Sequence, residues 1–204
     1  LDEPMADASI LPTYRLSKFT RQHVTVALGG DGGDELFAGY PTYLAHQMAR
    51  QYESFLTHSR PILSFLGNLL PVSDNNISFD FRVKKFLSGI GYPEGIRNFI
   101  WLGSFSFPEL KRVLPAELCS HVDPVQIMDK TTLLQYLDLK LYLQDDILVK
   151  VDRASMACSL EVRAPFLDYE LVEFVMNLPS SLKLRRFTSK YLLKKVMKDF
   201  LPKE

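Results

Sequence analysis

The sequence predicts an α/β fold, in which this chain is mostly α-helical and carries one clear parallel-type strand. Residues 23–28 are short, apolar and rich in β-branched side chains, and they end abruptly at a glycine, as a buried strand of a parallel sheet does. After this strand, apolar residues recur at helical spacing along almost the whole chain. One such strand followed by many helices is typical of the later part of an α/β domain, so we expect these residues to be a portion of a larger domain.

The helices are predicted in order along the chain. Residues 1–18 read as a loop that leads into a short helix, with Asp7 and Ser9 as candidate caps. Later helices are predicted at residues 44–55, 62–69, 79–90, 127–150, 169–178 and 188–200. The segments 73–78 and 89–95 are expected to be loops, because they are rich in polar residues or glycine and proline.

The helix at 169–178 has a well-defined start. Asp168 is the expected N-cap, since its carboxylate can accept hydrogen bonds from the unpaired N–H groups of the first turn. The apolar face of this helix is predicted to consist of Leu171, Val172, Phe174, Val175 and Leu178.

Composition excludes several classes of protein. The 204 residues carry 24 Lys and Arg against 24 Asp and Glu, a balance that argues against a general nucleic-acid binder. Cys119 and Cys158 are too few for a disulfide scaffold and form no zinc-binding pair. The most apolar stretch, residues 133–151, contains five charged side chains, too many for a membrane span. A cytoplasmic protein without a membrane partner is therefore expected.

The strongest local signal is the glycine turn at residues 28–40, LGGDGGDELFAGY. Four of the ten glycines of the chain fall within five residues directly after the strand, where α/β proteins bind ligands. The turn carries Asp31, Asp34 and Glu35 but no lysine, so it is not a P-loop. Because carboxylates repel phosphate unless a divalent cation lies between them, the turn predicts a nucleotide-phosphate and Mg²⁺ site. A purely structural strand-to-helix turn is the alternative.

Two further charged groups stand out. Asp146, Lys150 and Arg153 fall at i, i+4 and i+7, so they are expected on one helix face, with Leu143, Ile147 and Val151 on a core-facing one. The alternative is a solvated face with ion pairs worth about 0.2–0.5 kcal/mol each. Glu161 and Arg163 are best interpreted, from spacing alone, as a structural ion pair. The histidines form no metal-binding or triad pattern.

Three blocks in this order resemble the synthetase domain of the glutamine-dependent asparagine synthase family. They are residues 28–40, residues 145–157 (DDILVKVDRASMA) and residues 160–168 (LEVRAPFLD), and the resemblance covers nearly the whole chain. It implies an adenine-nucleotide alpha-hydrolase-like, Rossmann-like α/β domain, of which residues 1–204 are a part. A glutaminase domain and the S-G-G-x-D-S pyrophosphate-binding loop are expected upstream, outside these residues.

The resemblance implies an ATP-dependent amide-forming ligase that converts aspartate to asparagine. In this reaction ATP and Mg²⁺ activate the carboxylate as an acyl-adenylate, and glutamine-derived ammonia attacks it. The expected partners are aspartate or a similar carboxylate, ATP and ammonia, with no nucleic acid, and a homodimer of the complete protein fits the same picture. The alternatives are an amidotransferase acting on another carboxylate such as a sugar acid, a non-catalytic helical interaction protein, and a metal-phosphate hydrolase.

The resemblance also implies roles for individual residues. Asp31 and Asp146 are the expected catalytic acids, and Asp34 is the expected Mg²⁺ ligand. The nucleotide is expected to contact Gly29, Gly30, Gly32 and Lys190. Supporting positions of the site are Glu35, Lys150, Arg153, Glu161 and Arg163. Many relatives carry Ser where this chain has Gly29, which removes a hydroxyl from the nucleotide contacts and leaves the backbone N–H.

Overall fold

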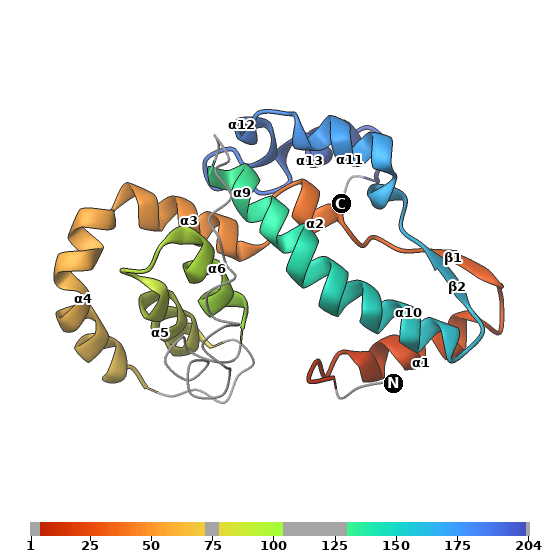
Figure 1. The fold of residues 1–204 in the computed structure, drawn as a ribbon, viewed down its shortest axis with the longest axis horizontal. Helices are drawn as coiled ribbons and strands as arrows, with labels where there is room; N and C mark the ends of the chain where they lie inside the picture. The colour runs from red at the N-terminus through yellow and green to blue at the C-terminus, as the bar shows by residue number, and fades with distance from the viewer. Residues whose placement is uncertain (1–4, 72–77, 104–129, 203–204) are drawn as a thin grey trace, which may run out of the picture. The chain divides into compact units, whose positions relative to one another are not determined.

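The computed structural model describes residues 5–71, 78–103 and 130–202, which divide into two compact units. Residues 1–40 and 135–204 belong to the first unit, and residues 41–134 belong to the second (Figure 1). The structure is mostly helical with a small parallel sheet, in agreement with the predicted α/β class. No helix in the described part of the chain is long and apolar enough to cross a bilayer.

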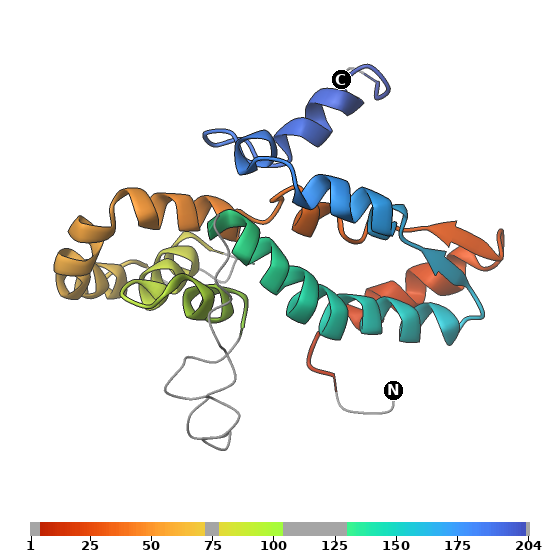
Figure 2. The same cartoon turned by 45° about the horizontal axis from the view of Figure 1, so that its top comes forward.

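The first unit contains the sheet and the long helix of the molecule. Its early elements are α1 (Ile10–Thr20), β1 (Val26–Leu28) and α2 (Gly33–Leu36). A continuous helical rod follows as α9 (Lys130–Leu137), η1 (Asp138–Ile147) and α10 (Leu148–Met156), with only the end of α9 in this unit. The chain then forms β2 (Glu161–Arg163), η2 (Pro165–Leu167), α11 (Tyr169–Met176), α12 (Ser180–Lys183) and α13 (Tyr191–Met197). Helix α1 lies alongside α10 (Figures 1 and 2).

The sheet consists of β1 and β2, which run parallel and pair Val26 with Glu161 and Leu28 with Arg163. Sequence reasoning predicted the first strand but missed the second, because the charged ends of Glu161–Arg163 hide its β character. The expectation that the first strand is buried is wrong. Leu28 is 74% exposed, since helix α10 contacts β2 and the described residues leave most of β1 uncovered.

The long helix differs from a regular α-helix in its middle. Residues Asp138–Ile147 are π-helical, and the helix ends at Met156, six residues beyond the predicted 150. The π segment fits more residues into each turn, so faces drawn with the α-helical period shift along it. Of the predicted core-facing side chains, Leu143 is buried whereas Ile147 and Val151 are only partly buried. Residues 127–129 of the predicted helix lie outside the described residues.

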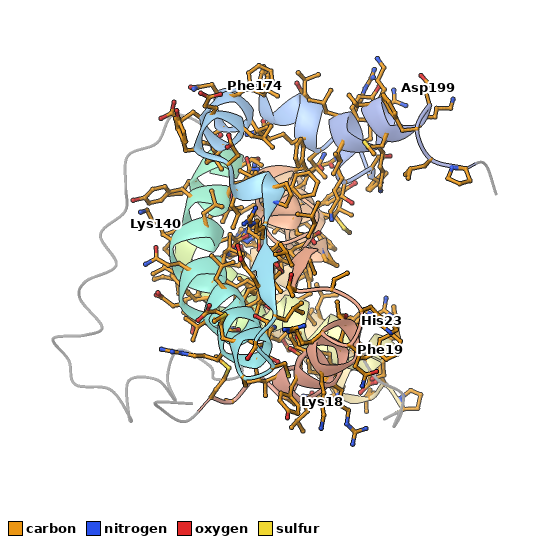
Figure 3. All side chains as sticks on the ribbon, turned by 90° about the vertical axis from the view of Figure 1, so that its right-hand side faces the viewer. Lys18, Phe19, His23, Lys140, Phe174 and Asp199 are labelled. Carbon is orange, nitrogen blue, oxygen red and sulfur yellow. The ribbon has the colours of Figure 1, made fainter. Side chains whose placement is uncertain are left out.

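The predicted start of helix α11 is confirmed, and its predicted apolar face is partly wrong. The Asp168 carboxylate accepts hydrogen bonds from the backbone N–H groups of Glu170 (3.1 Å) and Leu171 (3.3 Å). Val175 is buried, but Phe174 is 62% exposed and points outward from α11 (Figure 3). The helix ends at Met176, and a short helix of this length buries only a narrow stripe.

The core of the first unit gathers around helix α2. Leu36, Phe37 and Val175 form its buried centre. Partly buried apolar side chains from η1, η2, α11 and α13 surround this centre, namely Leu139, Phe166, Leu171, Val172, Met176 and Leu193. This core therefore joins the segment after β1 to the segment after β2.

The second unit is a helical bundle. It contains α3 (Pro41–Gln51), α4 (Glu53–Asn68), α5 (Phe79–Gly89), α6 (Glu94–Leu102) and the start of α9. Sequence reasoning predicted α5 and missed α6. It also placed a break before residue 62, whereas the structure breaks at Tyr52 and continues α4 through Pro61. Pro61 only removes one N–H from the helix ladder, and the flanking residues keep helical geometry.

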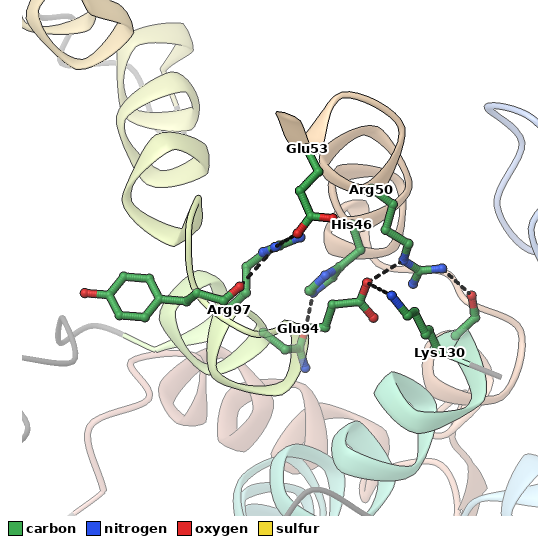
Figure 4. A network of polar contacts seen from close by, with 9 residues as sticks. His46, Arg50, Glu53, Glu94, Arg97 and Lys130 are labelled. Carbon is green, nitrogen blue, oxygen red and sulfur yellow. Dashed lines mark hydrogen bonds and ion pairs between the residues drawn. The ribbon is translucent and has the colours of Figure 1, made fainter. Parts of the chain in front are cut away.

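Apolar packing and a polar network together hold the second unit. Its buried apolar cluster is Ala49, Ile90, Ile100 and Trp101. In the network, Arg50 Nε lies 3.0 Å from Glu94 Oε1, and Lys130 Nζ lies 3.7 Å from the same oxygen (Figure 4). His46 is fully buried against Asn98, and burial lowers the pKa of His46 to about 3, so its ring is neutral. His46 is therefore a buried core residue.

The remaining differences concern element ends. Helix α1 starts at Ile10, and neither Asp7 nor Ser9 caps it with a side chain, because Asp7 bonds to the N–H and hydroxyl of Ser9 instead. Helix α13 is shorter than the predicted 188–200, and Ser180–Lys183 forms a short helix that sequence reasoning missed. Most of the predicted loop 73–78, together with Cys119 and His121, lies outside the described residues.

Removing the N-cap of α11 is expected to destabilise the first unit. Asp168→Ala leaves two backbone N–H groups without their acceptor and should lower the free energy of unfolding by about 0.5–2 kcal/mol. Asp168→Asn keeps an acceptor oxygen and should lose much less. Urea unfolding followed by circular dichroism measures both variants, and equal losses would contradict the capping role.

Candidate active site

The carboxyl ends of β1 and β2 carry two turns that touch each other. The N–H of Gly29 donates to the carbonyl of Arg163 at 2.7 Å, so pairing continues one residue beyond the strands. Gly32 then takes a positive φ of 89°, and a methyl group on it would overlap the side chain of Leu167. The glycine turn can therefore approach the turn after β2 this closely only because position 32 lacks a side chain.

The first two glycines of the turn differ in their surroundings. A Cβ on Gly30 would meet no atom within 4 Å, so the backbone there faces open space. A Cβ on Gly29 would lie 2.8 Å from Oδ2 of Asp31, because this carboxylate folds back over the end of β1. The turn thus offers an open backbone at Gly30 with the Asp31 carboxylate beside it.

Asp34 and Lys190 are brought together from distant parts of the sequence. The Lys190 ammonium lies 2.9 Å from Oδ1 of Asp34, and both side chains remain partly exposed, at 29% and 39%. Lys190 has a positive φ of 53°, and its N–H donates to the carbonyl of Phe37 at 3.1 Å. A methyl group on Gly39 would overlap both the Asp34 carboxylate and the Lys190 side chain, so the pair needs a glycine there.

Glu35 follows Asp34 but points into the protein. It is 1% exposed, and the hydroxyl of Tyr40 donates to its carboxylate at 2.6 Å. Burial raises the pKa of Glu35, the Tyr40 hydrogen bond opposes that rise, and the charges of Asp34 and Asp31 add to it. Burial and the Glu35 charge also raise the pKa of Tyr40, which keeps its proton as a hydrogen-bond donor. Glu35 is therefore an internal support for the turn.

Tyr142 links this buried acid to the long helix. Its ring meets the ring of Tyr40 edge to face, with 5.8 Å between the centroids. Burial raises the pKa of Tyr142, and the nearby charges of Asp146, Asp7 and Glu35 raise it further. Glu35 of the glycine turn and Asp146 of the helix are therefore both close enough to Tyr142 to raise its pKa.

Asp146 and Lys150 are positioned together with Asp7. The Lys150 ammonium donates to the Asp7 carboxylate at 2.6 Å, and this hydrogen bond lowers the pKa of Asp7 to about 2. Burial and the Asp7 charge raise the pKa of Asp146, while Lys150 lowers it. Asp146 is thus a partly buried carboxyl that holds a proton more readily than an ordinary aspartate.

The other predicted supporting residues lie on the surface of the unit. Arg163 Nε donates to Glu161 Oε1 at 2.7 Å, which confirms the predicted ion pair. Both side chains are exposed, so this pair contributes little to stability. Arg153 is exposed on α10, about one turn after Lys150.

In the part of the chain that the structure describes, an anionic ligand at the glycine turn would meet a short helix, one lysine and few metal-binding side chains. Helix α2 has only four residues, so the expected attraction of phosphate to a helix N-terminus is confined to one turn. The positive charge next to the turn comes instead from the Lys190 side chain. Among the described residues, no group of three or more His, Cys, Asp or Glu side chains could hold a metal ion. Magnesium often takes only one or two protein carboxylates plus phosphate oxygens, a donor set that the partly exposed Asp34 fits.

Sequence reasoning assigned no role to several residues that hold the site together. Tyr40 belongs to the glycine block, and its hydroxyl pairs with the buried Glu35 carboxylate. No sequence pattern indicates that Glu35 is buried, so this pairing could not be predicted. Tyr142, Gln135 and Lys183 contact the turn or its supports through tertiary packing alone. No local sequence pattern pointed to these residues, because their contacts join parts of the chain that lie far apart.

Comparison with known proteins gives a family model that matches this chain and several named relatives. The family model described as asparagine synthase matches residues 1–204. A putative glutamine-hydrolysing asparagine synthetase of Mycobacterium tuberculosis (strain H37Rv) is 34% identical over 99% of this chain and 31% of its own length. Asparagine synthetase 1 of Bacillus subtilis is 30% identical over 98% of this chain and 32% of its own length.

A more distant relative carries a different name. Amidase chyE of Penicillium rubens is 27% identical over 90% of this chain and 31% of its own length. The chain thus spans about a third of the length of the curated relatives it matches. No solved structure gives a significant match.

The contrast between Gly32 and Gly30 predicts unequal effects of the same substitution. Gly32→Ala adds a methyl group at positive φ against Leu167 and should lower the free energy of unfolding by about 1–3 kcal/mol. Gly30→Ala adds the same group in open space and should change it by less than about 0.5 kcal/mol. Chemical denaturation of both variants tests the pair, and a Gly32→Ala protein as stable as the parent would contradict the geometry.

The Lys150–Asp7 contact predicts a pH dependence. The pKa of Asp7 lies below its ordinary 3.8, so the contact stabilises the fold above about pH 4 and is lost as the pH falls toward 2. Lys150→Met should move the Asp7 titration midpoint up toward 3.8, as read from the carboxyl carbon by NMR. Lys140→Met is the control, because this lysine is exposed on the same long helix (Figure 3). An equal shift in the control would refute the pairing.

Proposed function

Because the chain belongs to the asparagine synthase family, we propose that it supplies part of the active site of an ATP-dependent amide-forming ligase. The proposed reaction converts aspartate, ATP and ammonia to asparagine, AMP and pyrophosphate. The complete polypeptide would contain the glutaminase that releases the ammonia and the pyrophosphate-binding loop. The chain itself corresponds to 31% of the length of the Mycobacterium tuberculosis relative.

The pairing of Asp34 with Lys190 is the observation that carries this proposal. It places one carboxylate and one ammonium 2.9 Å apart at the carboxyl end of a parallel strand, beside an open glycine backbone. Ligands bind at this end of the strands in open α/β sheets. A pyrophosphate leaving group needs charge neutralisation, which a half-exposed lysine held by its own backbone hydrogen bond can provide.

In the first step a substrate carboxylate oxygen attacks the α-phosphorus of ATP, and the bond to the β-phosphate oxygen breaks. The products are an acyl-adenylate and pyrophosphate. In this proposal the backbone at Gly29, Gly30 and Gly32 approaches the nucleotide, and Lys190 neutralises charge on the departing phosphates. Glu35 and its Tyr40 hydrogen bond fix the turn that carries Asp31 and Asp34.

In the second step ammonia attacks the acyl carbon, AMP leaves and the new amide loses a proton. A nearby carboxylate must accept that proton or orient the ammonia. Asp31 and Asp146 are the proposed residues. The raised pKa of Asp146 makes it a better proton acceptor than an ordinary aspartate. Lys150 pairs with Asp7, whose charge contributes to that raised pKa.

Asp34 is the residue proposed to hold Mg²⁺ together with phosphate oxygens. When bound, the ion would neutralise phosphate charge and allow acidic side chains to stand next to the nucleotide. The surface positions Arg153, Glu161 and Arg163 are proposed to support the site without touching the reacting atoms. Their exposure agrees with such a secondary role.

The acceptor carboxylate is proposed from the names of the relatives. Aspartate is favoured because relatives that cover 98–99% of the chain are named asparagine synthetases. Amidation of another carboxylate is the second candidate, and the relative named as an amidase supports testing it. A panel of amino acids and sugar acids therefore belongs in the assay.

The charged pair provides the test of this function. In the complete gene product, with ATP, Mg²⁺ and ammonium present, pyrophosphate release should depend on one carboxylate of the panel. Asp34→Asn and Lys190→Met should each slow that release by about 100-fold or more, because each removes charge stabilisation at the leaving group. Gly39→Ala should also slow it, since it separates the pair while keeping both charges.

Glu173→Gln is the matched control for the removal of an acid, because Glu173 is exposed on α11. It should leave the rate unchanged. Unchanged pyrophosphate release in Asp34→Asn would disprove the assigned role of the pair. Release of inorganic phosphate in place of AMP and pyrophosphate would identify a hydrolase, and the absence of any turnover would favour a non-catalytic protein.

A further inference from the structure

A buried chain of hydrogen bonds ends on helix α2, which carries Asp34. Lys183, at the end of α12, is 0% exposed, and its ammonium donates to the side-chain oxygen of Gln135 at 3.0 Å. Gln135, on α9, is also fully buried. Its amide nitrogen donates to the backbone carbonyls of Glu35 at 2.7 Å and Leu36 at 2.6 Å.

Helix α2 needs such external support. It has four residues, Gly33–Leu36, fewer than a helix requires to be stable by itself. Its last carbonyls have no partner within the helix, and Gln135 supplies one for two of them. Because Asp34 lies one residue before these carbonyls, a shift of the helix end would also move its carboxylate away from Lys190.

The Lys183 side chain and the two α2 carbonyls require the same orientation of the Gln135 amide. A lysine ammonium only donates hydrogen bonds, so the oxygen of the amide must point toward it. The NH₂ group then points at the two α2 carbonyls and uses both of its hydrogens. A second Lys183 contact, to the carbonyl of Met176 at 3.4 Å, anchors the ammonium to the end of α11.

The hydrogen bond from Lys183 also acts on the amide electronically. A donor at the amide oxygen polarises the amide and strengthens its N–H groups as donors. An apolar side chain in place of Lys183 would leave the buried Gln135 oxygen without a hydrogen-bond donor.

We propose that Lys183 is a positioning residue for the ligase reaction, which acts through Gln135 to hold helix α2 and so keeps Asp34 in register with Lys190. This inference rests on the proposed function for its catalytic consequence. The hydrogen-bonded chain from Lys183 to α2 does not depend on that function. Lys183 touches none of the reacting atoms.

A double-mutant cycle in the complete gene product tests the proposal. Lys183→Met and Gln135→Met should each lower kcat for pyrophosphate release by roughly 10–100-fold, as misplacement of a charged group by about an ångström does. The KM for ATP should stay within about threefold of the parent value. Because both residues act through one chain, the double variant should be no slower than the slower single variant.

Two further measurements keep the result independent of a loss of folding. Lys183→Gln retains a donor for the Gln135 oxygen and should recover part of the lost rate. Hydrogen exchange by mass spectrometry should show faster exchange in residues 33–39 of Lys183→Met, with exchange in the second unit unchanged. If Lys183→Met does not fold, the rate and the exchange of Gln135→Met test the same hydrogen-bonded chain.

The possible outcomes are distinct. Folded variants with the parent kcat and unchanged exchange in residues 33–39 would overturn the proposal, as would additive losses in the double variant. Parent protein that releases no pyrophosphate with any carboxylate would refute the proposed function instead. In that case, the exchange measurement alone decides whether Lys183 holds helix α2.

Discussion

Parallel pairing of β1 with β2 is the constraint on which the site depends. Two strands of three residues each bring residues 26–28 next to residues 161–163, although more than 130 residues of chain separate them. Since the strands run in the same direction, the turns that follow them emerge at the same edge of the sheet. Gly32 can then approach Leu167, and the core around Leu36 and Val175 closes behind both turns.

The site divides its acidic residues between structure and chemistry. Glu35 is buried, and its hydrogen bond with Tyr40 holds the turn in place. Asp34 stays partly exposed beside the Lys190 ammonium. A similar division holds at the long helix, where Lys150 pairs with Asp7, while burial and the Asp7 charge raise the pKa of Asp146. Burial and the choice of partner thus give identical residue types different roles.

Some features of the fold and the site could be predicted from local sequence. The first strand, the glycine turn after it and the cap of α11 by Asp168 depend on residues that are neighbours in the chain. Other features depended on tertiary packing. The π-helical segment shifted the predicted faces of the long helix, and Phe174 proved exposed because α11 buries only a narrow stripe. The second strand had no apolar pattern, because its charged ends point outward.

The sequence by itself determined which chemical groups are available and which family the chain resembles. Glycines followed by acids, and three blocks in a fixed order, are properties of the linear chain that need no contacts to be recognised. Only the tertiary structure decided which groups meet. The contact of Lys190 with Asp34, and the support of α2 by Gln135 and Lys183, join residues about 50 to 150 positions apart. Such contacts arise from strand pairing and core packing, which local spacing does not encode.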